Sequence, residues 1–229
     1  MNLAKMIDHT LLKPNLNQVE VQKAIEEAKY YGFYALCVAP MWVAYAAENL
    51  RNSKVKVCTV IGFPLGANTS ETKAYEAKEA ILNGADEVDM VINIAALKSG
   101  HYKKVVTDIQ VVVEAVKGTA KVKVIIETGL LTDKEKIKTC ELVKQAKADF
   151  IKTSTGFVNG GANAKDITLI RKVVGVDMGI KASGKIFTAD RALAMIKAGA
   201  NRIGTSAGVA ILKNLESVKF NDEEDFKRY

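Results

Sequence analysis

Short apolar runs rich in β-branched residues alternate with longer segments of helical periodicity along the whole chain. Some of these runs are almost continuously apolar, for example residues 122–126, as expected for strands that are covered on both faces. Alternation of this kind predicts parallel strands joined by crossover helices. The runs predicted as strands lie at 5–8, 33–38, 55–61, 87–93, 122–127, 149–154, 178–183 and 202–206.

Polar residues at fixed spacing predict where some of the helices begin. Asn17 with Glu20, and Thr132 with Glu135, have the spacing of a capping box, in which two side chains satisfy free N–H groups of the first helical turn. Thr188 is a further candidate N-cap, because it precedes a segment whose apolar residues share one helical face. The helices that follow the two capping boxes are expected over 18–31 and 133–147.

Three similar segments each lie between a predicted helix and the next predicted strand. They read Gly-Ala-Asp at 84–86, Lys-Ala-Asp at 147–149 and Gly-Ala-Asn at 199–201. A residue that tolerates the left-handed backbone conformation allows the chain to leave a helix and turn into a strand. The recurrence indicates a weak internal repeat of the strand–helix unit.

Eight strand–helix units in 229 residues predict a single α/β domain with the (β/α)₈ TIM-barrel fold. An open doubly wound sheet would usually have a glycine-rich nucleotide-binding turn after its first strand, and the sequence has no such turn. We assign residues 1–215 to the barrel. Residues 216–229 are highly charged and are expected to form a surface helix or a charged tail.

The net charge of +7 bears on the choice of partner. It arises from 28 lysines and five arginines that are spread along the chain, a pattern typical of solvated helical surfaces. A basic protein can attract an anionic metabolite or a nucleic acid. Because arginine is scarce and aromatic residues are not interleaved with basic ones, we expect no nucleic-acid partner.

Cysteine usage and the N-terminal sequence bear on the compartment. The three cysteines form no CxxC pair, so neither a disulfide framework nor a cysteine zinc site is predicted. The first residues lack the apolar stretch of a signal peptide, and no apolar run approaches the ~18 residues of a membrane span. We therefore expect a cytoplasmic protein that contacts no membrane.

Charged residues interrupt three of the predicted strands. Asp89, Lys152 and Lys181 lie among apolar residues, although an isolated buried charge is costly. Structural salt bridges would explain all three. The two lysines fall on adjacent strands, however, and neighbouring cations push one amine toward its neutral, nucleophilic form. The second explanation for these charges is therefore an imine-forming lysine. Catalytic groups of such barrels lie at the carboxyl ends of the strands, where such a lysine would be expected.

Glycine and hydroxyl residues follow the last three predicted strands. Gly156, Gly184 and residues 204–208 can present backbone N–H groups to a phosphate from loops at the strand ends. Isolated glycines are more often ordinary turn residues. Their recurrence after three consecutive late strands favours a phosphate site.

Histidine and cysteine offer little further chemistry. His9 and His101 are too few for a histidine metal site, and His9 is expected to be a hydrogen-bonded histidine near the end of the first strand. Cys37 is a candidate for the pocket wall. No histidine is placed to activate it as a nucleophile.

Six ordered motifs resemble those of the class I deoxyribose-phosphate aldolases, and the resemblance covers nearly the whole chain. Agreement by chance at six motifs in the same order is implausible. The motifs are IDHT at 7–10, TVIGFPLG at 59–66, EVDMVIN at 87–93, KVIIET at 123–128, FIKTSTG at 150–156 and RIGTS at 202–206.

The resemblance implies reversible cleavage of 2-deoxy-D-ribose 5-phosphate to D-glyceraldehyde 3-phosphate and acetaldehyde, with no metal and no cofactor. It also implies that Lys152 is the Schiff-base lysine and that Asp89 and Lys181 are a proton-relay pair. Lys123 is a further member of the polar cluster, and a homodimer is a possible assembly. The other substrate-binding residues it implies are Asp8, Thr10, Cys37 and Thr155, and the phosphate-binding residues are Gly156, Gly184, Lys185, Gly204, Thr205 and Ser206.

The loop after the seventh strand departs from the family pattern. The family usually reads KASGGIRT where this chain reads KASGKIFT, so Lys185 replaces a glycine and Phe187 an arginine. Ala207 stands where the family often has serine. The aldol residues are intact, and we predict that the Lys185 ammonium compensates for the lost phosphate contacts. The other explanation is that Lys185 points to solvent and that the remaining backbone donors near Gly156, Gly184 and Ser206 suffice. The alternative is a related lysine-dependent aldolase with weakened phosphate recognition.

Overall fold

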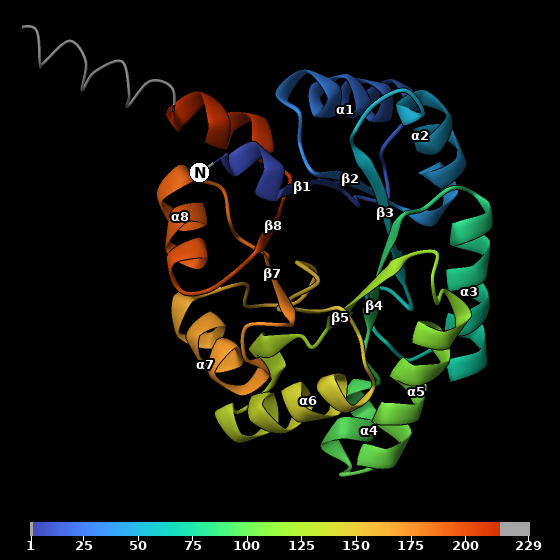
Figure 1. Cartoon of the computed structure of the whole chain (residues 1–229), viewed down its shortest axis with the longest axis vertical. Helices are drawn as coiled ribbons and strands as arrows, with labels where there is room; N and C mark the ends of the chain where they lie inside the picture. The colour runs from blue at the N-terminus through green and yellow to red at the C-terminus, as the bar shows by residue number, and fades with distance from the viewer. Residues whose placement is uncertain (1, 216–229) are drawn as a thin grey trace, which may run out of the picture.

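The computed structural model describes residues 2–215, and in this range eight parallel strands close into a barrel. The strands follow chain order around the barrel, and the last pairs with the first (Figure 1). The predicted (β/α)₈ fold is confirmed, whereas the prediction for 216–229 lies outside the described residues. The strands are β1 Ile7–Leu11, β2 Ala35–Val38, β3 Lys56–Ile61, β4 Glu87–Val91, β5 Lys121–Ile125, β6 Phe150–Lys152, β7 Gly179–Ser183 and β8 Arg202–Thr205.

Helices surround the barrel and connect its strands (Figure 1). Within residues 2–215 none is long and apolar enough to cross a membrane. The α-helices are α1 Gln18–Tyr31, α2 Val43–Leu50, α3 Ser70–Leu82, α4 Ile94–Lys98, α5 Tyr102–Ala115, α6 Asp133–Gln145, α7 Ala164–Val174 and α8 Ala189–Lys197. The 3₁₀ helices are η1 Leu3–Met6, η2 Pro40–Trp42 and η3 Thr128–Leu130, and residues 208–215 are also helical.

Several predicted local features are confirmed. Both capping boxes are present, at the start of α1 with Asn17 and at the start of α6 with Thr132. The Thr188 side chain caps α8 by accepting a hydrogen bond from a backbone N–H of the first turn. His9 Nε2 lies in hydrogen-bond contact with Glu27 Oε2 at 3.1 Å, as expected for a histidine with a structural partner.

The predicted first strand, at 5–8, is wrong at both ends. Residues Leu3–Met6 form the 3₁₀ helix η1, and β1 runs on to Leu11. The strand was hard to recognise because its polar residues Asp8 and Thr10 alternate with its other residues. A strand with one face in a polar interior has this period of two, which a search for a continuous apolar run misses.

The internal repeat has a structural role. The first residue of each repeat has a positive φ, and the third forms hydrogen bonds with the start of the preceding strand. The positive φ angles are 98° at Gly84, 62° at Lys147 and 118° at Gly199. The third side chains accept from strand N–H groups in the pairs Asp86–Val57 at 2.8 Å, Asp149–Val122 at 2.8 Å and Asn201–Ile180 at 3.0 Å. Each repeat thus joins two neighbouring strands at their amino ends.

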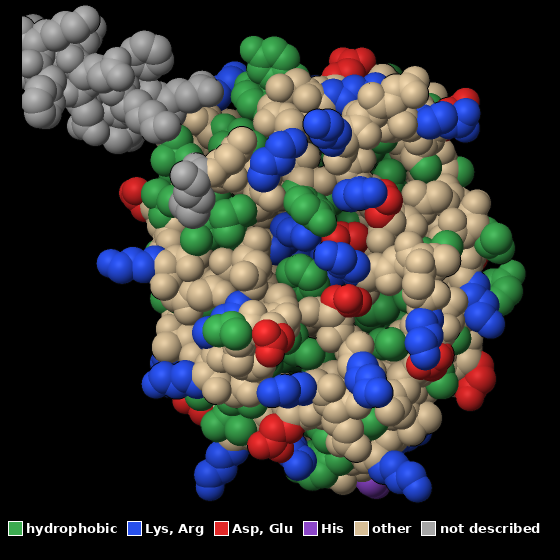
Figure 2. Space-filling view, viewed as in Figure 1, with side chains coloured by type: hydrophobic (Ala, Val, Ile, Leu, Met, Phe, Trp, Pro, Cys, Tyr) green, Lys and Arg blue, Asp and Glu red, His purple; other side chains and the backbone are tan. Residues whose placement is uncertain are grey.

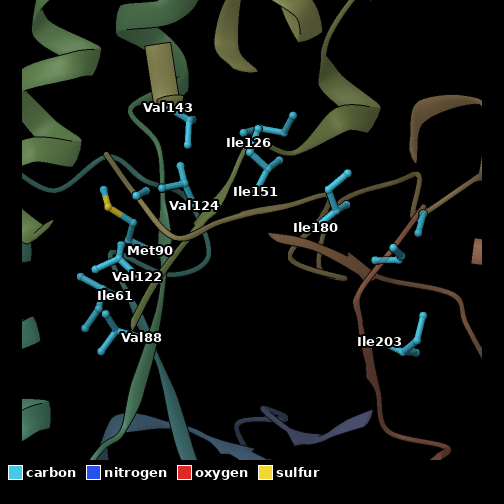
Figure 3. Close-up of a cluster of buried hydrophobic side chains, with 14 of the residues drawn as sticks. Ile61, Val88, Met90, Val122, Val124, Ile126, Val143, Ile151, Ile180 and Ile203 are labelled. Carbon is cyan, nitrogen blue, oxygen red and sulfur yellow. The ribbon is translucent and has the colours of Figure 1, made fainter. Parts of the chain in front are cut away.

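Alternate residues of the strands point in opposite directions. Those that point outward form a continuous apolar layer beneath the helices, part of which Figure 3 shows. Val88, Val124 and Ile180 belong to this layer. The residues that alternate with them point into the barrel, where charged side chains from different strands meet. The outer layer therefore stabilises the barrel, and the interior can hold a polar site.

Candidate active site

Asp89 lies at the centre of a group of lysines inside the barrel. Its Oδ2 accepts hydrogen bonds from Lys152 Nζ at 2.8 Å and Lys181 Nζ at 2.7 Å. Its Oδ1 accepts one from Lys123 Nζ at 2.8 Å. The lysines come from the consecutive strands β5, β6 and β7, and Lys152 is the Cα partner of Lys181. The structure therefore brings together the three residues predicted to carry the chemistry.

A second layer of charges lies toward the amino ends of the strands. Arg202 donates hydrogen bonds to Asp8 Oδ1 and Glu87 Oε2, both at 2.9 Å. Lys123 connects the two layers, because its Nζ also lies 2.7 Å from Glu87 Oε2. Asp8 Oδ2 lies 2.5 Å from Lys181 Nζ. With four basic side chains and three carboxylates, this charged cluster has one more cation than anion when all groups are ionised.

The members of the cluster determine one another's ionisation. Burial raises the pKa of Asp89, but the ammonium groups of Lys123, Lys152 and Lys181 together lower that pKa well below its usual range. Burial lowers the pKa of Lys181, but the carboxylates of Asp8 and Asp89 outweigh it and raise that pKa above the usual lysine value. Asp89 and Lys181 are therefore an ion pair at neutral pH.

Lys152 is the point where the cluster reaches a cavity. The cavity has a volume of about 460 Å³ and is lined by residues at the carboxyl ends of β1, β6, β7 and β8. Among the clustered charges of the described chain, Lys152 alone lines it. Figure 2 shows basic and acidic side chains close together at the centre of the face seen down the barrel. A molecule in the cavity can thus meet the Lys152 amine, while Lys181 lies behind it.

The far part of the cavity wall consists of loop backbone. Thr10 and Thr155, two of the predicted substrate-binding residues, line the cavity. Several of its backbone N–H groups, on loop residues beyond the strand ends, form no hydrogen bond with any of residues 2–215. Such groups can bind an anion. The predicted phosphate-binding residues that line the cavity are Gly156, Gly184, Lys185, Gly204, Thr205 and Ser206.

Three predicted substrate-binding residues do not reach the cavity wall. Asp8, Cys37 and Lys123 are fully buried inside the barrel. A hydrogen bond from its neighbour Cys58 lowers the pKa of the Cys37 thiol. These residues are placed to influence the surroundings of Lys152, and they do not line the space that a bound molecule would fill.

Some interior side chains have the spacing of metal ligands. Cys37, Cys58 and Asp89 form one such group, and Asp8, Cys58 and Glu87 form another. The three carboxylates already bind ammonium or guanidinium groups. Burial raises the pKa of the Cys58 thiol well above its usual value, so the thiol keeps its proton. Internal cations therefore fill the positions that a metal ion would need.

Three further charged residues are at most 5% exposed and were not predicted as site residues: Glu87, Glu127 and Arg202. Glu87 and Arg202 begin β4 and β8, and a charge within an apolar run, the signal that identified Asp89, could have identified them. Glu127 is different. Its backbone has φ 53°, and its carboxylate binds Thr155, which no periodicity reveals.

A closed barrel with one interior lysine exposed to a cavity, beside a carboxylate and further ammonium groups, has the arrangement of a lysine-dependent barrel enzyme. Residues 2–215 match the sequence model of the DeoC/LacD family aldolases. The chain belongs to this family.

Relatives and solved structures agree with this assignment. A deoxyribose-phosphate aldolase of Enterococcus faecalis is 64% identical over 212 residues, which cover 93% of this chain and 96% of the relative. One of Streptococcus sanguinis is 60% identical over 217 residues, 95% of this chain and 98% of the relative. The structure of a deoxyribose phosphate aldolase from Aeropyrum pernix, described as tetrameric, superposes with a TM-score of 0.88 at 34% identity, covering 94% of this chain and 92% of that one.

Proposed function

We propose that this protein reversibly cleaves 2-deoxy-D-ribose 5-phosphate to D-glyceraldehyde 3-phosphate and acetaldehyde through a Schiff base on Lys152. The observation that carries the proposal is that Lys152 is the one clustered lysine of the described chain that lines the cavity. The names of the Enterococcus and Streptococcus relatives support the substrate. A cytoplasmic location and a homodimer remain predictions.

The nucleophile must be a neutral amine. Lys123 contacts three carboxylates of the cluster and Lys181 contacts two. Among residues 2–215, Lys152 pairs with Asp89 alone and shares that carboxylate oxygen with Lys181. The cluster has one cation more than it has carboxylates, and Lys152 is the clustered lysine whose amine can meet a molecule in the cavity. The neutral amine attacks C1 of the open-chain sugar aldehyde, and loss of water gives an iminium ion.

The iminium ion then accepts the electron pair of the C2–C3 bond. A base removes the proton of the C3 hydroxyl, glyceraldehyde 3-phosphate leaves, and an enamine of acetaldehyde remains on Lys152. We assign the removal of this proton to Asp89, which acts together with Lys181 through a water molecule. Because the pKa of Asp89 is low, the carboxylate holds the proton only in passing. The same relay protonates the enamine at C2, and hydrolysis of the resulting iminium releases acetaldehyde and regenerates the amine.

Borohydride trapping with acetaldehyde tests the proposal. Reduction of the folded protein should leave an ethyl group on Lys152 alone, because the other clustered lysines are charged and lie behind the wall. Peptide mass mapping identifies the modified residue. The urea-unfolded chain is the control, since all its lysines are accessible. An adduct on another lysine, or no adduct, contradicts the assignment.

Lys181→Leu should shift the pH–rate profile to higher pH and lower turnover by roughly 10²–10⁴-fold. Lys181 and Lys152 donate to the same oxygen of Asp89, so without Lys181 the carboxylate would hold the proton on Lys152 more strongly. Lys73→Leu is the matched control, because Lys73 forms a buried pair with Asp108 at 2.6 Å and does not line the cavity. An unshifted profile would mean that burial, and not the charge of Lys181, activates Lys152.

Lys185 is the proposed replacement for the lost phosphate contacts. It keeps a glycine-like φ of 57° and lines the cavity, and it forms no hydrogen bond or ion pair within residues 2–215. Lys185→Ala should raise KM for deoxyribose 5-phosphate several-fold and leave KM for deoxyribose unchanged, and added salt should reduce the difference. Lys185→Gly relieves a left-handed strain of roughly 1 kcal/mol and separates strain from charge. Tighter substrate binding by Lys185→Gly would favour the alternative, an aldolase with weakened phosphate recognition.

A further inference from the structure

Glu127 is a buried carboxylate outside the charged cluster. It is 1% exposed, and none of the basic side chains among residues 2–215 forms an ion pair with it. Its partner is instead Thr155, in the loop that follows β6. Glu127 Oε2 accepts a hydrogen bond from Thr155 Oγ1 at 2.5 Å and one from the Thr155 backbone N–H at 3.1 Å. Burying a carboxylate without a cation beside it costs folding free energy. The position of Glu127 therefore calls for a functional explanation of its two hydrogen bonds to Thr155.

The backbone at Glu127 is also strained. Its φ of 53° and ψ of 66° place it in the left-handed region, which residues other than glycine and asparagine rarely adopt. This conformation ends the run of chain that continues β5 and begins η3. Strain at a residue beside a binding cavity is a reason to look for a functional role.

The hydrogen bonds of the loop after β6 show what Glu127 does there. Glu127 binds the N–H of Thr155, and the Thr155 hydroxyl accepts the N–H of Phe157 at 3.1 Å. Between them, the N–H of Gly156 has no acceptor among the described residues. The Thr155 hydroxyl proton is directed to Glu127, so this side chain holds the loop and has no proton left for a substrate. Glu127 and Thr155 thus leave the Gly156 N–H free for an anion.

The loops after β5, β6 and β7 pack backbone against backbone. A Cβ atom on Gly129 would lie 2.6 Å from Asn159 O, and one on Gly161 would lie 2.7 Å from Gly184 O. The N–H of Ala162 donates to the carbonyl of Gly184 at 3.1 Å. A displacement of the loop after β6 would therefore also move the loop that carries Gly184, a second wall of the cavity.

We infer that Glu127 is a positioning residue for the phosphate-binding end of the cavity, acting through Thr155 on the N–H of Gly156. The inference rests on the proposed function, because it takes the phosphate as the anion bound there. Glu127 itself does not line the cavity. Its removal should therefore weaken recognition of the phosphate and leave the Lys152 chemistry intact.

Kinetics with two substrates tests this inference. In Glu127→Ala and Thr155→Val, KM for deoxyribose 5-phosphate should rise about tenfold, the loss expected for one charge-assisted hydrogen bond. In Glu127→Ala, KM and kcat for deoxyribose, and ethyl labelling by acetaldehyde and borohydride, should stay at the parental values, because Glu127 does not line the cavity. The double variant should lose no more than the worse single variant, because both substitutions break the same contact. Thr155→Ser retains the hydroxyl and should restore the parental KM.

Control variants separate positioning from stability. Thr139→Val removes a buried hydroxyl from α6, away from the cavity, and should change neither KM. If Glu127→Ala does not fold, Glu127→Gln and the two variants Thr155→Val and Thr155→Ser provide the same comparison of KM for deoxyribose 5-phosphate. Equal losses with both sugars, additive losses in the double variant, or an unchanged KM would overturn the inference. A parent protein that fails to cleave deoxyribose 5-phosphate, or that is not labelled on Lys152, would instead overturn the proposed function.

Discussion

Lys152→Met is expected to lower kcat for deoxyribose 5-phosphate by at least roughly 10⁴-fold, the scale seen when an enzyme loses its covalent nucleophile. Methionine has a similar length and fills the same buried position, but it has no amine to form an iminium ion. The residual rate and the absence of an ethyl adduct after borohydride treatment measure the effect.

The same substitution should leave the protein at least as stable as the parent. The charged cluster has one cation more than it has carboxylates, and Lys152→Met removes that excess. A buried ionic group replaced by an apolar one of similar size is often neutral or stabilising. Thermal unfolding should therefore give an unchanged or raised Tm alongside the loss of turnover.

Lys152→Arg is the companion variant, because arginine keeps the positive charge and cannot supply a neutral amine. It should be as inactive as Lys152→Met but should not gain stability. Turnover within tenfold of the parent in either variant would mean that another lysine forms the Schiff base.

Much of the fold could be predicted from the sequence because its signals are local. Capping residues such as Thr132 and strand-length apolar runs report on neighbours within a few positions. The first strand was misplaced because its inward face is polar, so the apolar-run signal failed at Asp8. Its true bounds follow from its pairing with β2 and β8 in the closed barrel.

The site could be predicted in part. Charged residues within apolar strands identified Asp89, Lys152 and Lys181, and parallel topology placed them together. Their ionisation could not be predicted in the same way, because it depends on contacts between distant strands. The carboxylate of Asp8 keeps Lys181 charged, and only the closed barrel shows that β1 and β7 side chains meet. The excess of one cation over the carboxylates likewise becomes visible only when the charged side chains of all these strands are counted together.

Asp89→Asn should abolish most turnover and also destabilise the protein. The proton-relay role that the resemblance implies for Asp89 would by itself predict an effect on turnover far larger than that on stability. The structure changes this expectation, because the fully buried carboxylate contacts Lys123, Lys152 and Lys181. Breaking a buried ion pair on one side typically costs about 3–5 kcal/mol of unfolding free energy. We expect a loss of that order together with a fall in kcat of at least roughly 10³-fold.

The pH dependence of stability separates this electrostatic cause from a packing defect. The folded pKa of Asp89 lies well below its unfolded value, so its contribution is present above about pH 4 and is lost as the pH falls through the folded pKa. In Asp89→Asn the buried ammonium groups lack this partner, which lowers their pKa and favours the unfolded state until the pH approaches about 10. The difference in unfolding free energy between parent and variant should therefore be largest near neutral pH and smaller in both acid and alkali. Urea unfolding across this pH range measures the difference in unfolding free energy. Asp108→Asn is the control, because it breaks the buried Lys73–Asp108 pair and should leave the turnover of the enzyme at the parental value. A difference that is constant with pH would show that Asp89 stabilises the barrel by packing, and near-normal turnover would remove it from the proton relay.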